Sequence, residues 1–280
     1  MLREMAVNSI IQYIEDNLEN FFINIESLVD YSGYSRRYLQ ITFKEYMGIP
    51  VGQYIRKRRI SRAAALLRLT HLPIIDISGR LFYDSQQTFT REFKKIMGYT
   101  PRQYRVNPFW SFKNLLGRRE INKKYLSPTL CFLEQQEVFG KLFNHDGLIL
   151  YSGVDTKTRW GKAYDYLQNN NATVVSNKIP FNNGNITAQT VVWCSQKESN
   201  CTIVIDEGLY AHFKFSGSAE EYITYMYDIY YNSLPIYNLD KKNSYDIEII
   251  ERQDNGIFNC HYYLPLYAES SGYNTFNRMD

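Results

Sequence analysis

The feature that most constrains this chain is an internal repeat, with an offset of 50 residues, in its first half. Seven residue pairs are identical between the two copies: Ser35 and Ser85, Phe43 and Phe93, Lys44 and Lys94, Met47 and Met97, Gly48 and Gly98, Gln53 and Gln103, Tyr54 and Tyr104. Self-similarity at a fixed offset indicates one structural unit used twice. The first half must therefore build the same small fold two times in succession.

Each copy predicts two short helices joined by a tight turn. In the first copy Asn24 is typical of a helix N-cap, Gly33 of the turn, and Ser35 of the cap of the next helix. Leu39 and Phe43 recur at helical spacing and define the buried side of that second helix. Two short helices around a glycine-containing turn form a helix-turn-helix, whose second helix can enter the major groove of DNA.

Between the copies, residues 51–69 are rich in Ala and Leu and contain no proline. They predict one connecting helix, about 28 Å long at about 1.5 Å per residue. One turn of B-DNA is about 34 Å, so this connector can hold the two second helices in successive major grooves. We therefore expect a monomer that binds an asymmetric site on double-stranded DNA.

The polar side of each second helix supplies candidate DNA contacts. Arginine suits guanine, glutamine suits adenine, and an apolar tip suits the thymine methyl group. The expected base-reading residues are Arg37, Gln40, Ile41, Gln86, Gln87, Thr88 and Arg91. The expected phosphate contacts are Arg36, Lys44, Arg56, Arg58, Arg59, Arg62, Thr90, Lys94 and Lys95. Two alternatives stay open: these are ordinary solvated polar residues, or some connector arginines pair with Glu15, Asp16 or Glu19.

Charge is divided unevenly along the chain. Residues 1–120 hold 19 Lys and Arg against 11 Asp and Glu, a net charge of +8, whereas the remaining residues carry −5. A basic block favours a polyanionic partner for the first half, although a charge run is also common on a merely solvated face.

Several stretches resemble the AraC/XylS family of regulators, and within it the MarA/SoxS/Rob group. They include residues 32–35, 52–56, 73–77 and 84–91, and in the last of these Gln86, Gln87, Thr88 and Arg91 match the family motif. The resemblance implies a monomeric seven-helix activator that contacts RNA polymerase. The first reading helix departs from the family, because Arg37 replaces a tryptophan and Ile41 an arginine.

The second half alternates apolar and polar residues in runs typical of strands. Strands are expected at 129–143, 188–194, 202–205, 210–215, 245–251 and 258–266, helices at 159–168 and 218–232, and a turn at 182–185. The order strand, helix, strand, strand, used twice, predicts an α+β domain. Together with the stretch 259–266 it resembles a GyrI-like effector domain.

Candidate ligand-pocket residues in this domain are Trp160, Trp193, Tyr210, Tyr225 and His261. His261 stands where relatives that bind lipophilic cations commonly carry an acidic residue, so a neutral or anionic amphipathic effector is expected. Aromatic residues at these spacings are also typical of plain core, and a lone histidine on a strand is often structural. No nucleophile–base pair, metal-ligand spacing or phosphate loop indicates an enzyme or a cofactor, and a redox role of the four scattered cysteines is the weaker alternative.

The sequence thus predicts a multidomain protein: an all-α DNA-binding domain with two helix-turn-helix units at 1–112, a linker at 113–125, the GyrI-like domain at 126–270 and a tail at 271–280. No signal sequence or apolar span is evident, so a cytoplasmic, nucleoid-associated location is expected. The expected function is sequence-specific regulation of transcription, with activation as the expected direction and a C-terminal domain that senses a small amphipathic molecule or a partner. The alternative is a nucleoid-type protein of low DNA specificity.

Overall fold

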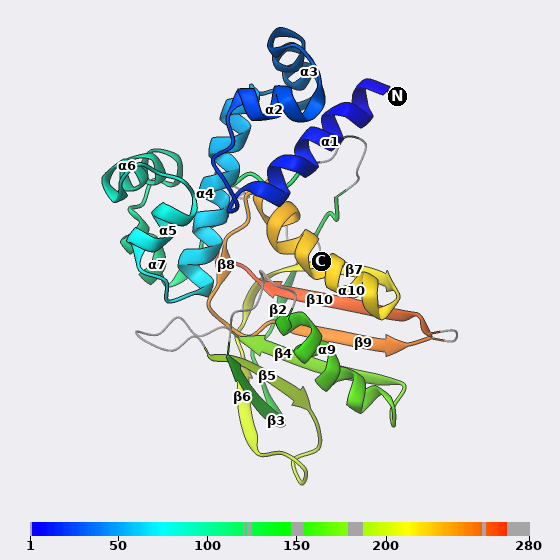
Figure 1. Ribbon diagram of the computed structural model, residues 1–280. Coiled ribbons are helices and arrows are strands. Elements are labelled where there is room, and N and C mark those ends of the chain that lie inside the picture. Colours follow the sequence, from blue (N-terminus) through cyan, green and yellow to red (C-terminus); the bar gives the residue numbers. More distant parts are fainter. Residues whose placement is uncertain are drawn as a thin grey trace. The chain divides into compact units, whose positions relative to one another are not determined.

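The computed structural model describes residues 2–119, 121, 125–146, 154–178, 187–253 and 256–267. The chain divides into two compact units (Figure 1). A helical unit comprises residues 1–68, 72–105 and 114–125, and a sheet unit comprises residues 69–71, 106–113 and 126–280. An all-α first part and an α+β second part confirm the predicted fold class.

The helical unit carries the helices α1 (Leu2–Asn17), α2 (Ile25–Ser32), α3 (Arg36–Met47), α4 (Val51–Leu69), α5 (Ile74–Arg80), α6 (Gln86–Met97) and α7 (Pro101–Val106). The pairs α2–α3 and α5–α6 are the two predicted helix-turn-helix units. The connector α4 begins and ends where the sequence predicts. In Figure 1, α3 lies near one end of α4, and α6 lies to one side of α4.

The second helices of the two units, α3 and α6, begin and end in the same way, whereas the ends of α2 and α5 differ. Ser35 and Ser85 cap α3 and α6 by accepting hydrogen bonds from the backbone three residues on. Gly48 and Gly98 end the two helices in the left-handed region, with φ of 73° and 79°.

The repeated aromatic residues make the same contact in each copy. Phe43 meets Tyr54, and Phe93 meets Tyr104, each edge to face at 5.4 Å between ring centroids. The two copies therefore share the caps of their second helices and this aromatic contact.

The segment predicted as a linker, residues 113–125, lies largely within the helical unit. Leu116 is buried in the core formed by α1, α3 and α4. Its backbone N–H donates to the hydroxyl of Ser61, and the N–H of Ile121 donates to the side chain of Asn8. Before this return the chain contributes Phe109 and Trp110 to the sheet unit, as it does residues 69–71, so it passes between the two units five times.

The sheet unit contains two short paired strands, β1 (Phe109–Trp110) and β8 (Lys241–Lys242), and a sheet in the order β2-β7-β10-β9-β4-β5-β3-β6. The strands are β2 (Thr129–Leu133), β3 (Gln136–Asp146), β4 (Ala172–Lys178), β5 (Thr187–Trp193), β6 (Cys201–Ile205), β7 (Gly208–Gly217), β9 (Ile247–Arg252) and β10 (Phe258–Pro265). The described ladders are antiparallel.

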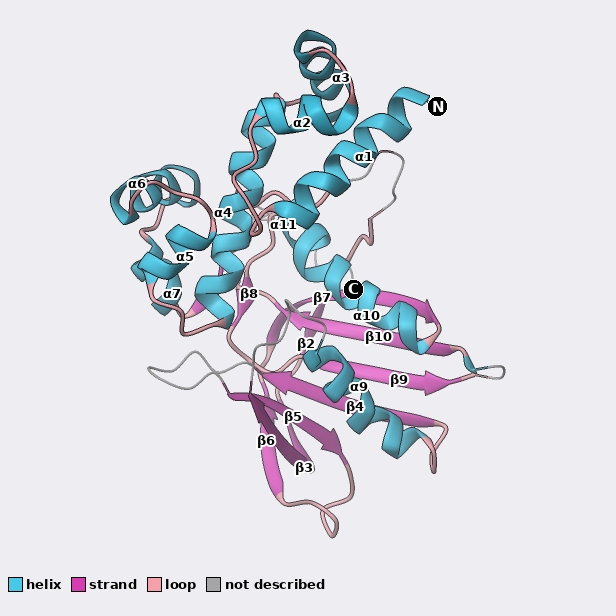
Figure 2. Cartoon of the chain, in the orientation of Figure 1, coloured by secondary structure: helices cyan, strands magenta, loops and turns pink. Residues whose placement is uncertain are grey.

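The helices of the sheet unit are α9 (Val154–Leu167) and α10 (Ala219–Asp228), which continues through a π-helical turn (Ile229–Ser233) into α11 (Leu234–Ile236). The order β3-α9-β4-β5 followed by β7-α10-β9-β10 confirms the predicted repeated pattern. Both helices lie over one face of the sheet (Figure 2), and we call the opposite side the open face.

The sheet curls so that apolar side chains pack together on the open face. Ile205, Tyr210 and Val191 belong to this cluster and are at most 1% exposed. Gly140 on β3 permits the curl, because a Cβ atom there would lie 2.3 Å from a methyl carbon of Val191 and 2.8 Å from the carbonyl oxygen of Val192.

Three features of the sheet unit differ from the sequence prediction. The single strand expected at 129–143 is two strands, β2 and β3, which are interrupted at residues 134–135 and do not pair with each other. Strand β4 was not predicted, and the helix expected to run to residue 232 becomes π-helical at Ile229. The turn expected at 182–185 and the tail at 271–280 lie outside the described residues. No helix in the described ranges is both long enough and apolar enough to cross a membrane.

Candidate nucleic-acid interface and effector surface

The outer side of α3 carries the base-reading residues predicted for the first repeat. Leu39, Phe43 and Met47 are buried beneath it. The base-reading candidates Arg37, Gln40 and Ile41 and the phosphate candidate Lys44 are all exposed, and Ile41 is 48% exposed despite its apolar side chain. An apolar residue in solvent on a polar helix face is available to contact a thymine methyl group.

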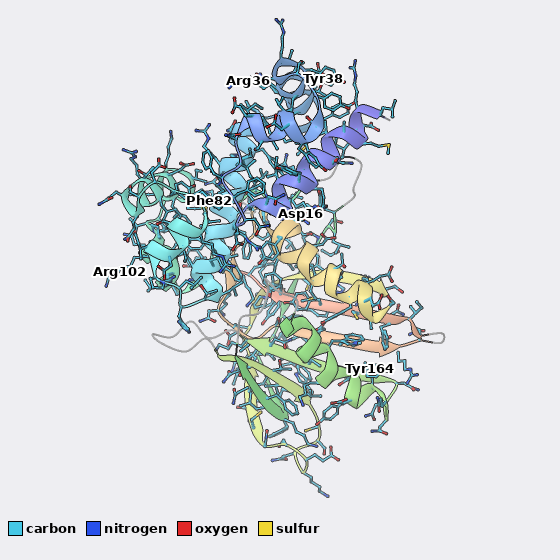
Figure 3. The ribbon with its side chains drawn as sticks, viewed as in Figure 1. Asp16, Arg36, Tyr38, Phe82, Arg102 and Tyr164 are labelled. Carbon is cyan, nitrogen blue, oxygen red and sulfur yellow. The ribbon has the colours of Figure 1, made fainter. Side chains whose placement is uncertain are left out.

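Arg36 begins α3 and lies beside Tyr38 in Figure 3. Its guanidinium pairs with the Glu26 carboxylate at 3.3 Å, with both side chains at least 60% exposed. An exposed pair of this kind is weak and exchanges readily with water, so Arg36 stays available to a phosphate.

The outer side of α6 presents the second set. Phe89, Phe93 and Met97 are buried, whereas Gln86, Gln87 and Arg91 are exposed and Thr88 and Thr90 are partly exposed. Thr88 is fixed by a hydrogen bond of 3.0 Å between its hydroxyl and that of the cap Ser85. The seven base-reading candidates thus all reach the surface on α3 and α6.

A groove of about 410 Å³ lies between α6 and the beginning of α4. Cationic side chains line it from both helices: Arg56 and Lys57 from α4, and Arg91 and Lys95 from α6. One carboxylate, Glu92, lies among them. The groove beside α6 therefore carries four cations and one anion, and this net positive charge suits the phosphodiester backbone of DNA.

Two arginines of α4 do not belong to this surface, which corrects the phosphate role expected for them. Arg58 is 3% exposed, and its guanidinium binds both carboxylate oxygens of Glu15, at 2.7 and 2.6 Å. Arg59 is 7% exposed and lies 4.9 Å from the ring centroid of Phe22. Burial lowers the pKa of the Arg59 guanidinium. The burial of both side chains is incompatible with phosphate contact in this structure.

Arg62 also makes an internal ion pair. Its guanidinium donates to one oxygen of Glu19, and Arg80 of α5 donates to the other. The Glu19 side chain is only 11% exposed. Glu19 follows α1, so this one carboxylate joins the first repeat, the connector and the second repeat.

The five predicted pocket residues of the sheet unit do not converge. Trp160 on α9 packs against Tyr222 and Phe258, and Tyr225 on α10 packs against Phe215, both in the layer between helices and sheet. The other three, Trp193, Tyr210 and His261, lie on strands whose side chains at these positions share the open face. The structure thus separates two of the five from the expected pocket.

His261 has a partner that the sequence did not suggest. Its Nδ1 lies 3.0 Å from Nε2 of His212 on the neighbouring strand β7, and Tyr263 stacks on His212 at 4.3 Å. Burial, His261 and Lys214 together lower the pKa of His212. Lys214 is the cross-strand partner of His261, so the open face offers imidazole and ammonium donors together.

Sequence reasoning also missed two buried carboxylates. Glu248 on β9 is fully buried and accepts a hydrogen bond from the hydroxyl of Tyr222. Asp246 is 2% exposed and accepts from the Tyr262 hydroxyl at 2.6 Å and from the backbone of Asn177. Their partners lie at least 16 residues away in sequence, so local patterns carry no signal for them.

Comparisons with known proteins agree with this arrangement. The helix-turn-helix domain family matches residues 28–107, and the family of GyrI-like small molecule binding domains matches residues 131–266. The F1 operon positive regulatory protein of Yersinia pestis is 61% identical over 272 residues, which cover 96% of this chain and 90% of that protein. The chain belongs to the AraC family of transcription regulators.

Other relatives match a smaller share of the chain. The right origin-binding protein of Escherichia coli is 42% identical over 105 residues, covering 38% of this chain and 36% of that protein. Among solved structures, the C-terminal domain of AraT, a response regulator from Geobacillus stearothermophilus, is 37% identical, with a TM-score of 0.35, and covers 36% of this chain and 83% of that one. Membership of the family makes DNA the partner of the helical unit.

Proposed function

We propose that this AraC-family regulator binds an asymmetric promoter site as a monomer, with α3 and α6 in successive major grooves. The observation that carries the proposal is the exact repetition of the two helices. They have the same length, the same serine and glycine ends, and exposed polar faces, and one helix of 19 residues joins the two units. Since that helix is about 28 Å long and a DNA turn is about 34 Å, two reading heads fit one face of a duplex.

Base reading is assigned to the exposed residues of the two helices. Arg91 and Gln87 of α6 suit guanine and adenine, and Arg37, Gln40 and Ile41 of α3 offer the same chemistry together with a thymine contact. Thr88 and Gln86 complete the set on α6.

Phosphate neutralisation is assigned to the cations around the reading helices, with Thr90 as a polar contact. The cations are the exposed Arg36, Lys44, Arg56, Lys94 and Lys95 and the partly exposed Lys57. If roughly six phosphates are contacted, affinity should fall on the order of a thousandfold between about 50 and 200 mM salt.

We further propose that the sheet unit senses a small amphipathic molecule on its open face and that the protein activates transcription through contact with RNA polymerase. The apolar cluster around Tyr210, flanked by His212, His261 and Lys214, suits a neutral or anionic amphiphile. The name of the Yersinia pestis relative, a positive regulatory protein, supports activation rather than repression.

Single substitutions test the DNA assignment by separating reading from neutralisation. Arg91→Ala should cost roughly 1–3 kcal/mol on the best site and relax specificity at one base pair, whereas Lys95→Ala should weaken binding to all sequences alike and reduce the salt slope by about 1. Arg3→Ala removes an exposed cation from α1 and serves as the matched control. Unchanged affinity and specificity for Arg91→Ala would overturn the assignment of α6.

The alternative function is a nucleoid-type protein that binds DNA with little sequence preference. It makes the opposite prediction for Arg91→Ala, a uniform loss across sequences that resembles the loss caused by Lys95→Ala. Because both variants are measured on the same set of duplexes, one experiment distinguishes the two functions.

A further inference from the structure

The sheet unit contains a cleft of about 620 Å³ at the end of α9. Strands β4 and β5 pair from Val175 with Val192 to Lys178 with Gln189. Beyond Val175 the beginning of β4 pairs with β9, while the end of β5 stays beside β3. The two strands therefore diverge, and the cleft occupies the space that this divergence leaves.

The cross-strand register places the cleft on the side of the sheet that bears the helices. Lys141 of β3 is opposite Val192, and Val192 is opposite Val175. Val175 in turn is opposite Glu248. Tyr222 of α10 binds Glu248, so this row of side chains faces the helices. The charged residues of the cleft differ from His212, Lys214 and His261 of the open face, while Val174 and Trp193 at its edge also belong to the apolar cluster.

Charges of both signs converge on this cleft. Lys141 brings an ammonium group from the sheet, and its Nζ lies 5.6 Å from the ring centroid of Tyr166 in the last turn of α9. A hydrogen bond to Tyr166 raises the pKa of Lys141. Asp165 on α9 and Glu198 in the turn between β5 and β6 contribute exposed carboxylates.

The remaining lining mixes polar residues with Ala172, Val174, Trp193 and Cys194, and the cleft has a size suited to a small molecule. Thr173 is buried at the beginning of β4, and the amides of Asn169 and Asn170 follow the end of α9. The volume falls in the range of about 300–1,000 Å³ that is usual for ligand sites, although these sites are commonly more apolar. An apolar amphiphile would leave the three charged groups without partners, which costs binding free energy.

We propose that this cleft binds a small zwitterion of the size of an amino acid or a short peptide. The ligand's carboxylate lies at Lys141 and Tyr166, and its ammonium group lies between Asp165 and Glu198. Such a molecule satisfies both signs of charge at once, whereas an ion of a single sign meets at least one group of like charge. This second ligand would bridge α9, β3 and the β5–β6 turn of the sheet unit.

Calorimetry with the full chain tests the proposal through three related probes: the dipeptide alanyl-alanine, its C-terminal amide and its N-acetyl derivative. The dipeptide should bind with a Kd of about 1 mM or lower, and each capped derivative should bind about tenfold more weakly. Equal affinities for the three probes, or no heat of binding at about 10 mM dipeptide, would overturn the proposal.

Variants assign the two ends of the ligand. Lys141→Met should remove the preference for the dipeptide over its amide, and Asp165→Asn combined with Glu198→Gln should remove the preference over the acetylated form. Glu137→Gln, which alters an exposed residue of the same strand outside the cleft, should change neither preference.

Thermal unfolding and binding to a DNA site are measured on the same preparations. A folded chain that binds DNA specifically but does not distinguish the probes would overturn this inference and leave the proposed DNA-binding function intact. Loss of specific DNA binding with a retained preference for the dipeptide would overturn the proposed DNA-binding function and leave this inference intact.

Discussion

Arg58 and Arg36 both pair with a glutamate, but they do so in different surroundings. The Arg58 and Glu15 side chains are 4% and 9% exposed, whereas those of Arg36 and Glu26 are 64% and 60% exposed. When one partner of a buried ion pair is removed, the other charge stays buried without a counter-charge or water around it. When one partner of a surface pair is removed, the other charge is still hydrated. The same residue type therefore stabilises the fold at one position and remains available for DNA at the other.

Arg58→Ala should lower the free energy of unfolding by about 3–5 kcal/mol, because it leaves the Glu15 carboxylate buried and uncompensated. Arg36→Ala, the control, should change it by at most about 1 kcal/mol. Urea denaturation of both variants measures the difference. An Arg58→Ala variant that unfolds like the original chain but loses affinity for every DNA sequence would restore Arg58 as a phosphate contact.

At the scale of elements, the helical repeat was predictable to the residue and the sheet only in outline. The sequence marks the ends of α3 and α6 locally, by a serine before each helix and a glycine after it. Strand β4 has no such signal, because its Ser176 and Asn177 are buried and polar. Asn177 is satisfied by Asp246, 69 residues away, and an interaction over that distance leaves no local pattern.

The same limit applies to the candidate sites. Outward positions on a helix follow from its buried stripe, so the base-reading candidates were predicted and do reach the surface. Which arginines of α4 are internal depends on Glu15 and Glu19, which lie 43 residues away, so the sequence could offer that pairing only as an alternative. His212 and Lys141 became candidates only once strand register was known.

The glycine ends of the reading helices can be tested by substitution. Gly98→Ala should destabilise the helical unit by about 1–2 kcal/mol, because its φ of 79° is unfavourable for a residue with a Cβ atom. No atom lies within 4 Å of the added carbon, so the cost is conformational rather than steric.

Gly52→Ala is the matched control, because Gly52 lies within α4 with equal space around it. This change should leave stability unaltered or raise it by up to about 1 kcal/mol. Equal effects of the two substitutions in thermal unfolding would contradict the capping role of Gly98.

At the scale of the whole molecule, the spacing of the two reading helices depends on α4 and on Glu19. Glu19 binds Arg62 of the connector and Arg80 of the second repeat at the same time. Two reading heads held at a fixed separation discriminate between DNA sites whose blocks differ in spacing, whereas loosely joined heads tolerate both spacings.

Glu19→Gln should therefore reduce discrimination against a site with one inserted base pair by about 1 kcal/mol, since it removes a partly buried ion pair. Glu26→Gln, which alters the exposed pair of Arg36, is the control and should preserve the discrimination. Affinities for duplexes with the original and the lengthened spacing measure the effect. If both variants discriminate as the original chain does, Glu19 does not set the spacing.

The central claim, that one chain reads DNA with two heads, is tested most directly by selecting binding sites from random duplexes with the full chain at physiological salt. We predict one asymmetric motif whose two conserved blocks lie about one helical turn apart, roughly 10 base pairs. A motif with a single block or a palindrome, or the absence of any enriched motif, would contradict the account.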